Sequence, residues 1–308
     1  MEENQVTEVN KPLTPSTGGF TYSAAVVAFI LATVAVSTII KLAGLEEKSD
    51  GYIYLSYLAS PIAIIISFAV VWKIKNFSVR KVIPIKCSWK YYIIAILLIY
   101  GLLFSLSWIN DVSVKFFELF GYKPRESSSY IPDITDAKVI PAILVIAVLP
   151  ALFEELLFRG ALLNSCVEGV GTVRTVLIVG FCFALYHGSP EQTVYQFIAG
   201  CAFTFIAVRS GSIIPSVIMH FINNAIIVIL SACSCFDESG ALIISSGGNI
   251  ALIVTSAVSL ICALVWLVLD KKPLIKCQRG AVKSFFIYAS VGIAILALIW
   301  IVSLFGIM

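Results

Sequence analysis

Apolar stretches long enough to cross a membrane recur along the whole chain. A transmembrane helix needs ~20 mostly apolar residues, and segments of this length satisfy their backbone polar groups in lipid as helices. Nine candidate segments lie near residues 20–40, 52–72, 91–109, 139–163, 173–190, 193–208, 213–232, 250–269 and 284–306. The sequence therefore predicts an all-α fold, a polytopic transmembrane helix bundle of about eight or nine spans.

Composition supports the membrane assignment. Hydrophobic residues make up 59% of the chain and charged residues 13%, whereas a soluble domain has about 25% charged residues. The eight cysteines are scattered, mostly within or beside apolar runs, which is typical of small buried hydrophobic residues rather than of a disulfide or zinc framework. The basic residues lie in the connections, so membrane lipid is an expected partner and nucleic acid is not.

Charge also predicts the orientation. Residues 1–19 contain three glutamates and one lysine, the wrong sign for a secretory signal peptide. Lysine and arginine accumulate in cytoplasmic loops, and here they concentrate in the connections 73–90 and 270–283. The prediction is a cytoplasmic tail at 1–19 and a single transmembrane domain at 20–308, in a multi-pass protein of the cell membrane. The pattern says nothing about the oligomeric state.

The longest connection, about 110–138, contains a short amphipathic run before a serine-rich stretch at 127–129. Phe116, Phe117 and Phe120 would share one side of a short helix lying at the membrane interface. A structured connector is the first interpretation of this segment, and a lid over a site entrance is the alternative.

The fourth apolar segment carries three charged side chains, Glu154, Glu155 and Arg159. A charge at the centre of a membrane helix costs ~2.5 to 3.5 kcal/mol, so two adjacent carboxylates require a reason. Residues four apart share a helix face, so Arg159 is placed to neutralise Glu155 while Glu154 points away. A carboxylate without a cationic partner suits general base catalysis on water. The alternative is an ion pair that only fixes helix packing.

Both histidines of the chain also lie within apolar segments. His187 follows Phe183 by one turn, and His220 shares a helix face with Asn224. By depth along their helices, these side chains reach the level of Glu154. One sensible arrangement has Glu154 and His187 deprotonate a water while His220 and Asn224 donate hydrogen bonds to an oxyanion. Packing contacts and an interhelical hydrogen-bond network are the alternatives.

The three motifs EExxxR, FxxxH and HxxxN, in this order on three apolar segments, resemble the CPBP family of intramembrane glutamate proteases. This family, also called Abi, includes the CAAX prenyl endopeptidases and bacterial proteins tied to bacteriocin processing or self-immunity. The resemblance covers a catalytic core at about 139–232. It implies Glu154 and His187 as water activators, His220 and Asn224 as oxyanion stabilisers, and Glu155 with Arg159 as supporting residues. It implies no metal and no cofactor.

The expected function is therefore hydrolysis of a peptide bond in a membrane-associated peptide or lipidated protein. A zinc-dependent intramembrane protease is one alternative, although no HExxH motif occurs. A nucleophilic Cys182 is a weak alternative, because five residues on a helix turn it away from His187. A transporter or a bacteriocin-immunity partner that acts by binding alone is the non-enzyme alternative. The sequence does not choose among substrates.

Overall fold

The structure is a computed structural model, which describes residues 12–47, 49–77, 82–124, 138–236, 242–270 and 274–306. Its helices are α1 (Pro15–Leu42), α2 (Asp50–Lys75), α4 (Lys90–Ser105), α5 (Trp108–Glu118), a continuous helical stretch from α6 to α8 (Val139–Val170), α9 (Thr172–Tyr186), α10 (Thr193–Ser210), α11 (Ile214–Ala232), α12 (Ser246–Leu269) and α13 (Ala281–Leu304). The described part contains no strand, only one isolated bridge between Phe236 and Leu242. The predicted all-α bundle is confirmed.

Every predicted apolar segment forms a helix, but not every helix spans the membrane. Within the described residues, seven helices are long and apolar enough to cross, and α4 with α5, bent by 42°, gives up to eight. α9 has 15 residues, which corresponds to about 22 Å, less than the ~30 Å hydrocarbon thickness. The fifth predicted span, 173–190, is therefore corrected to a short helix, and the count of seven, or eight with α4 and α5 as one span, lies at or below the lower end of the prediction.

The first helix begins earlier than predicted. The Thr14 side chain caps the helix by accepting a hydrogen bond from the backbone N–H of Thr17, and Pro15 occupies the first turn. The predicted tail boundary at residue 19 therefore lies inside α1, while residues 1–11 lie outside the described part. Gly19 lies within this helix. α13 packs directly on it, and an added Cβ would lie 2.3 Å from the Phe285 carbonyl oxygen.

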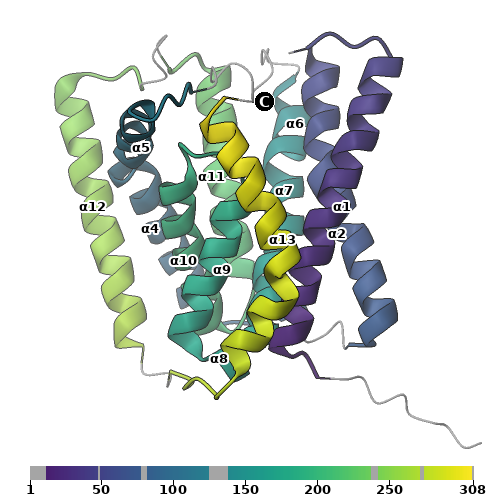
Figure 1. Ribbon diagram of the computed structural model, residues 1–308. Helices are drawn as coiled ribbons and strands as arrows, with labels where there is room; N and C mark the ends of the chain where they lie inside the picture. Colours follow the sequence, from purple (N-terminus) through teal and green to yellow (C-terminus); the bar gives the residue numbers. More distant parts are fainter. Residues whose placement is uncertain are drawn as a thin grey trace, which may run out of the picture.

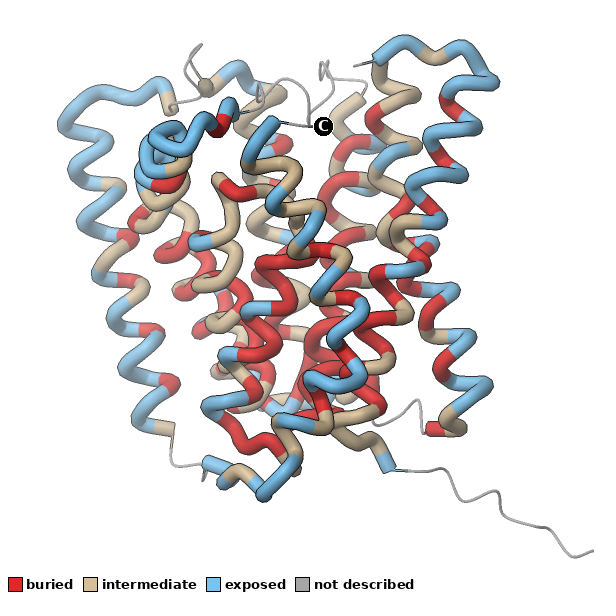
Figure 2. The backbone as a smooth tube through the Cα atoms, viewed as in Figure 1, coloured by how far each residue is buried: buried red, intermediate tan, exposed pale blue. Residues whose placement is uncertain are grey.

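The helices form one bundle with its buried residues at the centre (Figures 1 and 2). α1 packs against α2 and α13 at one edge, α12 packs against α4 at the other, and α9 and α10 pack together in the middle. α1 begins at the lower end of the bundle in Figure 1 and α13 ends at the upper end. Exposed apolar residues cover the outside, as expected for side chains that face lipid.

The stretch Val139–Val170 departs twice from regular α-helical geometry. Two π-helical segments, η3 (Ile143–Val148) and η4 (Leu156–Leu162), flank the short α7 (Leu149–Glu155). π-helical turns are rare and occur frequently at functional sites. Both predicted site glutamates belong to α7, so the two distortions bracket them.

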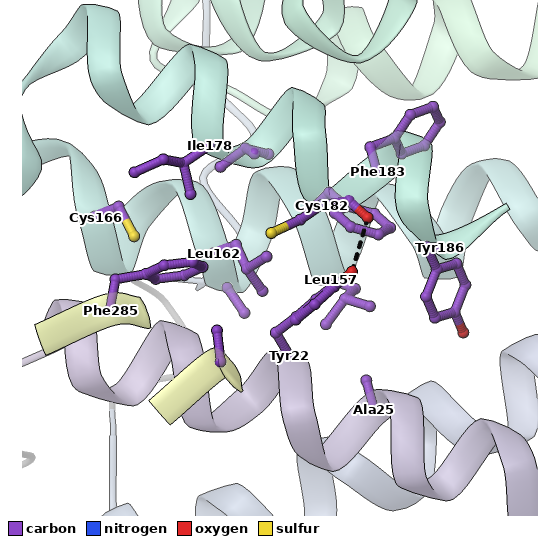
Figure 3. Packing of buried hydrophobic residues seen from close by; sticks show 14 of the residues in the cluster. Tyr22, Ala25, Leu157, Leu162, Cys166, Ile178, Cys182, Phe183, Tyr186 and Phe285 are labelled. Carbon is purple, nitrogen blue, oxygen red and sulfur yellow. Dashed lines mark hydrogen bonds between the residues drawn. The ribbon is translucent and has the colours of Figure 1, made fainter. Parts of the chain in front are cut away.

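An apolar cluster joins α1, the long helical stretch, α9 and α13 (Figure 3). The Tyr22 hydroxyl donates a hydrogen bond to the Cys182 carbonyl at 3.0 Å, which ties α1 to α9. The Cys182 thiol is fully buried in this cluster. The thiol thus packs among apolar side chains, which agrees with the prediction that a nucleophilic Cys182 is a weak alternative.

The predicted connector at 110–138 begins with α5. Phe116 contacts both Phe117 and Phe120, with ring centroids 5.3 and 5.4 Å apart. Phe117 also packs against Trp300 of α13 at 5.6 Å, while Phe116 and Phe120 are exposed. α5 thus presents an apolar face outward and is fastened to the bundle through Phe117. The serine-rich stretch 127–129 lies outside the described residues.

α9 and α10 approach each other closely at two glycines. A Cβ added at Gly200 would lie 3.0 Å from the Gly180 Cα, and one added at Gly180 would lie 2.5 Å from the Cys201 sulfur. Only a residue without a side chain fits at these positions. The contact brings α10 beside the part of α9 that leads to Phe183 and His187.

The substitution Gly180→Ala should therefore destabilise the protein by about 1–3 kcal/mol through overpacking, as measured by chemical unfolding in detergent micelles. Gly247→Ala is the control, because nothing lies within 4 Å of its added Cβ. Replacing Cys201 by Ala in the Gly180→Ala background should restore part of the loss. Equal effects at the two glycines would contradict the close contact.

Candidate active site

A buried ion pair links α7 to the following turn. The Arg159 Nη1 lies 2.7 Å from the Glu155 Oε1, and both side chains are fully buried. The Arg159 Nη2 donates a second hydrogen bond to the Gly200 carbonyl at 2.8 Å. The predicted pairing of Glu155 with Arg159 is confirmed, and the guanidinium also connects the long helical stretch to α10.

Aromatic rings enclose the Arg159 guanidinium. Its central carbon lies 4.6 Å from the ring centroid of Phe183, 5.2 Å from that of Phe203 and 5.8 Å from that of Phe158. A cation over aromatic faces is stabilised electrostatically, most strongly when water is excluded. The rings therefore compensate part of the cost of burying this charge.

Glu155 also binds His220. The His220 Nδ1 lies 3.0 Å from the same Oε1 that contacts Arg159. A carboxylate neutralised by arginine is an acceptor, so the His220 Nδ1 carries the hydrogen and donates it. This contact fixes the imidazole and leaves its Nε2 for another partner.

The main chain of α9 fixes His187. The His187 Nδ1 lies 2.8 Å from the Phe183 carbonyl oxygen. Because a carbonyl can only accept, the Nδ1 is protonated and the Nε2 of the neutral ring has a free lone pair. The Phe183 ring lies 4.7 Å from the His187 ring and 5.9 Å from the His220 ring, between centroids. Both histidines are thus held against one aromatic side chain.

Glu154 differs from Glu155 in having no hydrogen-bond partner. Its side chain is 9% exposed, and its buried Oε2 is unsatisfied within the described part of the chain. It interacts electrostatically with His187 and with Arg159. A buried carboxylate oxygen without a donor is costly, so this atom is available for a ligand or a water molecule.

Asn224 contacts the main chain of the first π-helical segment, η3. Its Nδ2 donates to the Ile146 carbonyl at 3.1 Å. In a regular helix the N–H of residue 150 would bind that carbonyl, but residue 150 is a proline without an N–H. Asn223 donates in turn to the Asn224 Oδ1 at 3.0 Å. His220 and Asn224 therefore both face the long helical stretch, as predicted from their spacing, but they bind different atoms of it.

Comparison with known proteins identifies this region. Residues 136–226 match the model of the family described as type II CAAX prenyl endopeptidase Rce1-like. The central segment is similar to this family. It contains all six predicted site residues and agrees with the resemblance to the CPBP family. Comparisons with curated proteins and with solved structures find no match for the chain.

Two residues of the candidate site escaped the sequence analysis. Phe203 closes the aromatic enclosure of Arg159 and lies 5.9 Å, between ring centroids, from His220. Gly200 supplies the carbonyl for Arg159. Both belong to α10, where no polar motif marks them in the sequence. The structure shows why Gly200 matters, because a Cβ added there would lie 3.1 Å from the Phe183 ring.

Among the described residues, no three His, Cys, Asp or Glu side chains group so as to hold a metal ion.

Removing one member of the buried ion pair should strongly lower the free energy of unfolding. Arg159→Met is expected to cost about 3–5 kcal/mol, because Glu155 would remain buried without a cation. Adding Glu155→Leu should recover most of this loss. The control Lys115→Met, at an exposed position, should change stability by no more than about 0.5 kcal/mol. Unfolding free energies in micelles test this, and equal effects of Arg159→Met and Lys115→Met would contradict it.

The origin of the Asn224 contact can be tested with a double-mutant cycle. Asn224→Ala should cost about 1–3 kcal/mol, because it leaves the Ile146 carbonyl without a side-chain donor. In a Pro150→Ala background the cost should be smaller, since the introduced alanine supplies a backbone N–H. Strictly additive unfolding free energies would show that the proline has no part in the contact.

Proposed function

We propose that this protein is an intramembrane endopeptidase that hydrolyses peptide bonds with a water molecule activated by Glu154 and His187. The observation that carries the proposal is the buried Glu154 carboxylate, which has an unsatisfied oxygen and an electrostatic interaction with a histidine of free Nε2. A general base needs an available lone pair near the proton that it removes. Membership of the segment in an endopeptidase-like family supports the same chemistry.

The reaction balances without a covalent enzyme intermediate. A water O–H bond breaks, its proton passes to Glu154, and the water oxygen forms a bond to the scissile carbonyl carbon. The carbonyl π electrons move to the oxygen and create an oxyanion. When the oxyanion collapses, the C–N bond breaks and Glu154 returns the proton to the leaving amine. His187 holds the water through its Nε2 and shares the proton.

The oxyanion requires hydrogen-bond donors, and Asn224 and His220 are the proposed ones. The Asn224 amide uses one of its two N–H bonds on Ile146, so the second is available. The His220 Nδ1 is already bound to Glu155, so its Nε2 can donate only when the ring carries both protons.

Glu155 and Arg159 act in this proposal as positioning residues. Glu155 orients the His220 ring, and Arg159 neutralises Glu155 while fastening α10 through Gly200. Each of the two side chains already forms hydrogen bonds to its neighbours, whereas Glu154 forms none with the described residues. Preorganised donors of this kind typically account for several kcal/mol of transition-state stabilisation.

The proposed substrate is a membrane-associated peptide or a lipidated protein such as a prenylated CAAX tail, which would reach the site from the lipid. We place the protein in the cell membrane, with its N-terminus in the cytoplasm. Lys73, Arg174 and Lys283 lie at or near helix ends at the lower end of the bundle in Figure 1, which supports this orientation through the positive-inside rule. A role in bacteriocin immunity stays a prediction from the resemblance.

Glu154→Gln tests the proposed base. It should reduce the cleavage rate of a quenched fluorescent peptide, offered with and without a prenyl group, by about 10²–10⁴-fold. Glu168→Gln is a matched control, because Glu168 is exposed and lies on the same helical stretch. Both variants should keep wild-type helix content. Full activity of folded Glu154→Gln would contradict Glu154 as the base, whereas no cleavage by the folded wild-type protein would favour a protein that acts by binding alone.

Metal removal separates the glutamate mechanism from the zinc alternative. Cleavage by the purified protein should survive treatment with a strong chelator, because no step of the proposed mechanism uses a metal. Activity lost on chelation and restored by stoichiometric zinc would contradict the mechanism and replace it with metal-assisted hydrolysis.

A further inference from the structure

A cavity of about 640 Å³ lies between the start of α9 and the start of α13, away from the candidate active site. Its lining consists of Arg174, Cys277, Gln278, Arg279, Gly280, Val282 and Lys283. Three of these residues are cationic and none is acidic. α9 begins at Thr172 and has 15 residues before His187, so about 22 Å of helix separate the cavity from the catalytic end of α9.

Main-chain contacts build the wall of this cavity. The Thr172 N–H donates to the Ile275 carbonyl at 3.0 Å, and the Ile275 N–H donates to the Thr172 hydroxyl at 3.0 Å. The Gln278 N–H donates to the Gly169 carbonyl at 2.7 Å. Gly171 has φ +83, and an added Cβ would lie 2.7 Å from the Cys277 nitrogen. The segment before α13 is therefore pressed onto the turn between α8 and α9.

The positive charge of the cavity is not neutralised within the described part of the protein. Arg174, Arg279 and Lys283 are exposed, and none of them forms an ion pair there. α9 and α13 both begin without a side-chain cap. Helix N-termini carry a partial positive charge, although the first N–H of α9, that of Thr172, already donates to the Ile275 carbonyl. Cations and helix ends thus add to one positive field that favours an anion with several acceptor oxygens.

We propose that this cavity binds the phosphate group of an anionic membrane lipid. The cavity lies at the lower end of the bundle, where α2 ends and where α9 and α13 begin (Figure 1). Lipid phosphates lie at this level, next to the ends of transmembrane helices. Basic pockets between such helices bind anionic headgroups, and a volume of this size accommodates one.

Cys277 provides a local reporter of occupancy, because it lines the cavity and its thiol is free and half-buried. The full-length protein is placed in vesicles of phosphatidylcholine, with or without phosphatidylglycerol. Peptide mass spectrometry then measures how fast N-ethylmaleimide labels Cys277 relative to Cys233, a free cysteine that follows α11 at the other end of the bundle. Phosphatidylglycerol should slow the relative labelling of Cys277 by about tenfold when it saturates the cavity.

A charge-matched pair of variants separates the cavity from the general surface charge. Arg174→Gln with Lys283→Gln should weaken the lipid affinity by about tenfold or more and abolish the protection. Lys73→Gln with Lys86→Gln removes the same charge from exposed positions near the same end and should keep it. Circular dichroism checks both folds, and the single variant Arg279→Gln repeats the test if the first pair fails to fold.

Inorganic phosphate in pure phosphatidylcholine vesicles identifies the source of the phosphate group. No protection by inorganic phosphate, together with protection by phosphatidylglycerol, supports the lipid. Protection by inorganic phosphate alone would overturn the lipid assignment. Equal loss of protection in both variant pairs, or no protection by either anion, would overturn the cavity as a phosphate site.

Discussion

The architecture around the candidate site depends on one buried cation, the Arg159 guanidinium. It neutralises Glu155, binds the Gly200 carbonyl of α10 and lies between the rings of Phe183 and Phe203. Without it, Glu155 would be an unpaired charge in low dielectric and could not hold His220. One buried cation thus connects three helices, and its ion pair and aromatic contacts stabilise ionised groups inside the bundle.

Division of labour between adjacent glutamates follows from this arrangement. Each glutamate has a buried Oε2 without a partner among the described residues, but the Glu155 Oε1 is occupied by Arg159 and His220, whereas Glu154 forms no hydrogen bond there. The two π-helical segments flank α7, and the Asn224 amide binds the Ile146 carbonyl within the first of them. Strain and unsatisfied groups gather where a substrate would react, which is typical of catalytic sites.

Much of this was predictable from the sequence, since it rests on local geometry. The four-residue spacing predicted the pairing of Glu155 with Arg159, and the apolar segments predicted the helices. The predicted segment 173–190 was too long, because it continued past Tyr186 to residue 190, whereas the chain turns at Gly188, with φ +63. The contact of His220 with Glu155 and the role of Phe203 depend on how distant helices pack, which a single sequence does not encode in a short motif.

The tautomers of the two histidines test the account most directly. The chain has only two histidines, so ¹⁵N-labelled imidazoles give four resonances in an NMR spectrum of the full protein, assigned with a His220→Gln variant. The account predicts that the His187 Nδ1 carries the proton, held by the Phe183 carbonyl, with an unprotonated Nε2, and that the His220 Nδ1 is protonated against Glu155. A His187 ring protonated only at Nε2 would contradict it, because no lone pair would then be available for water.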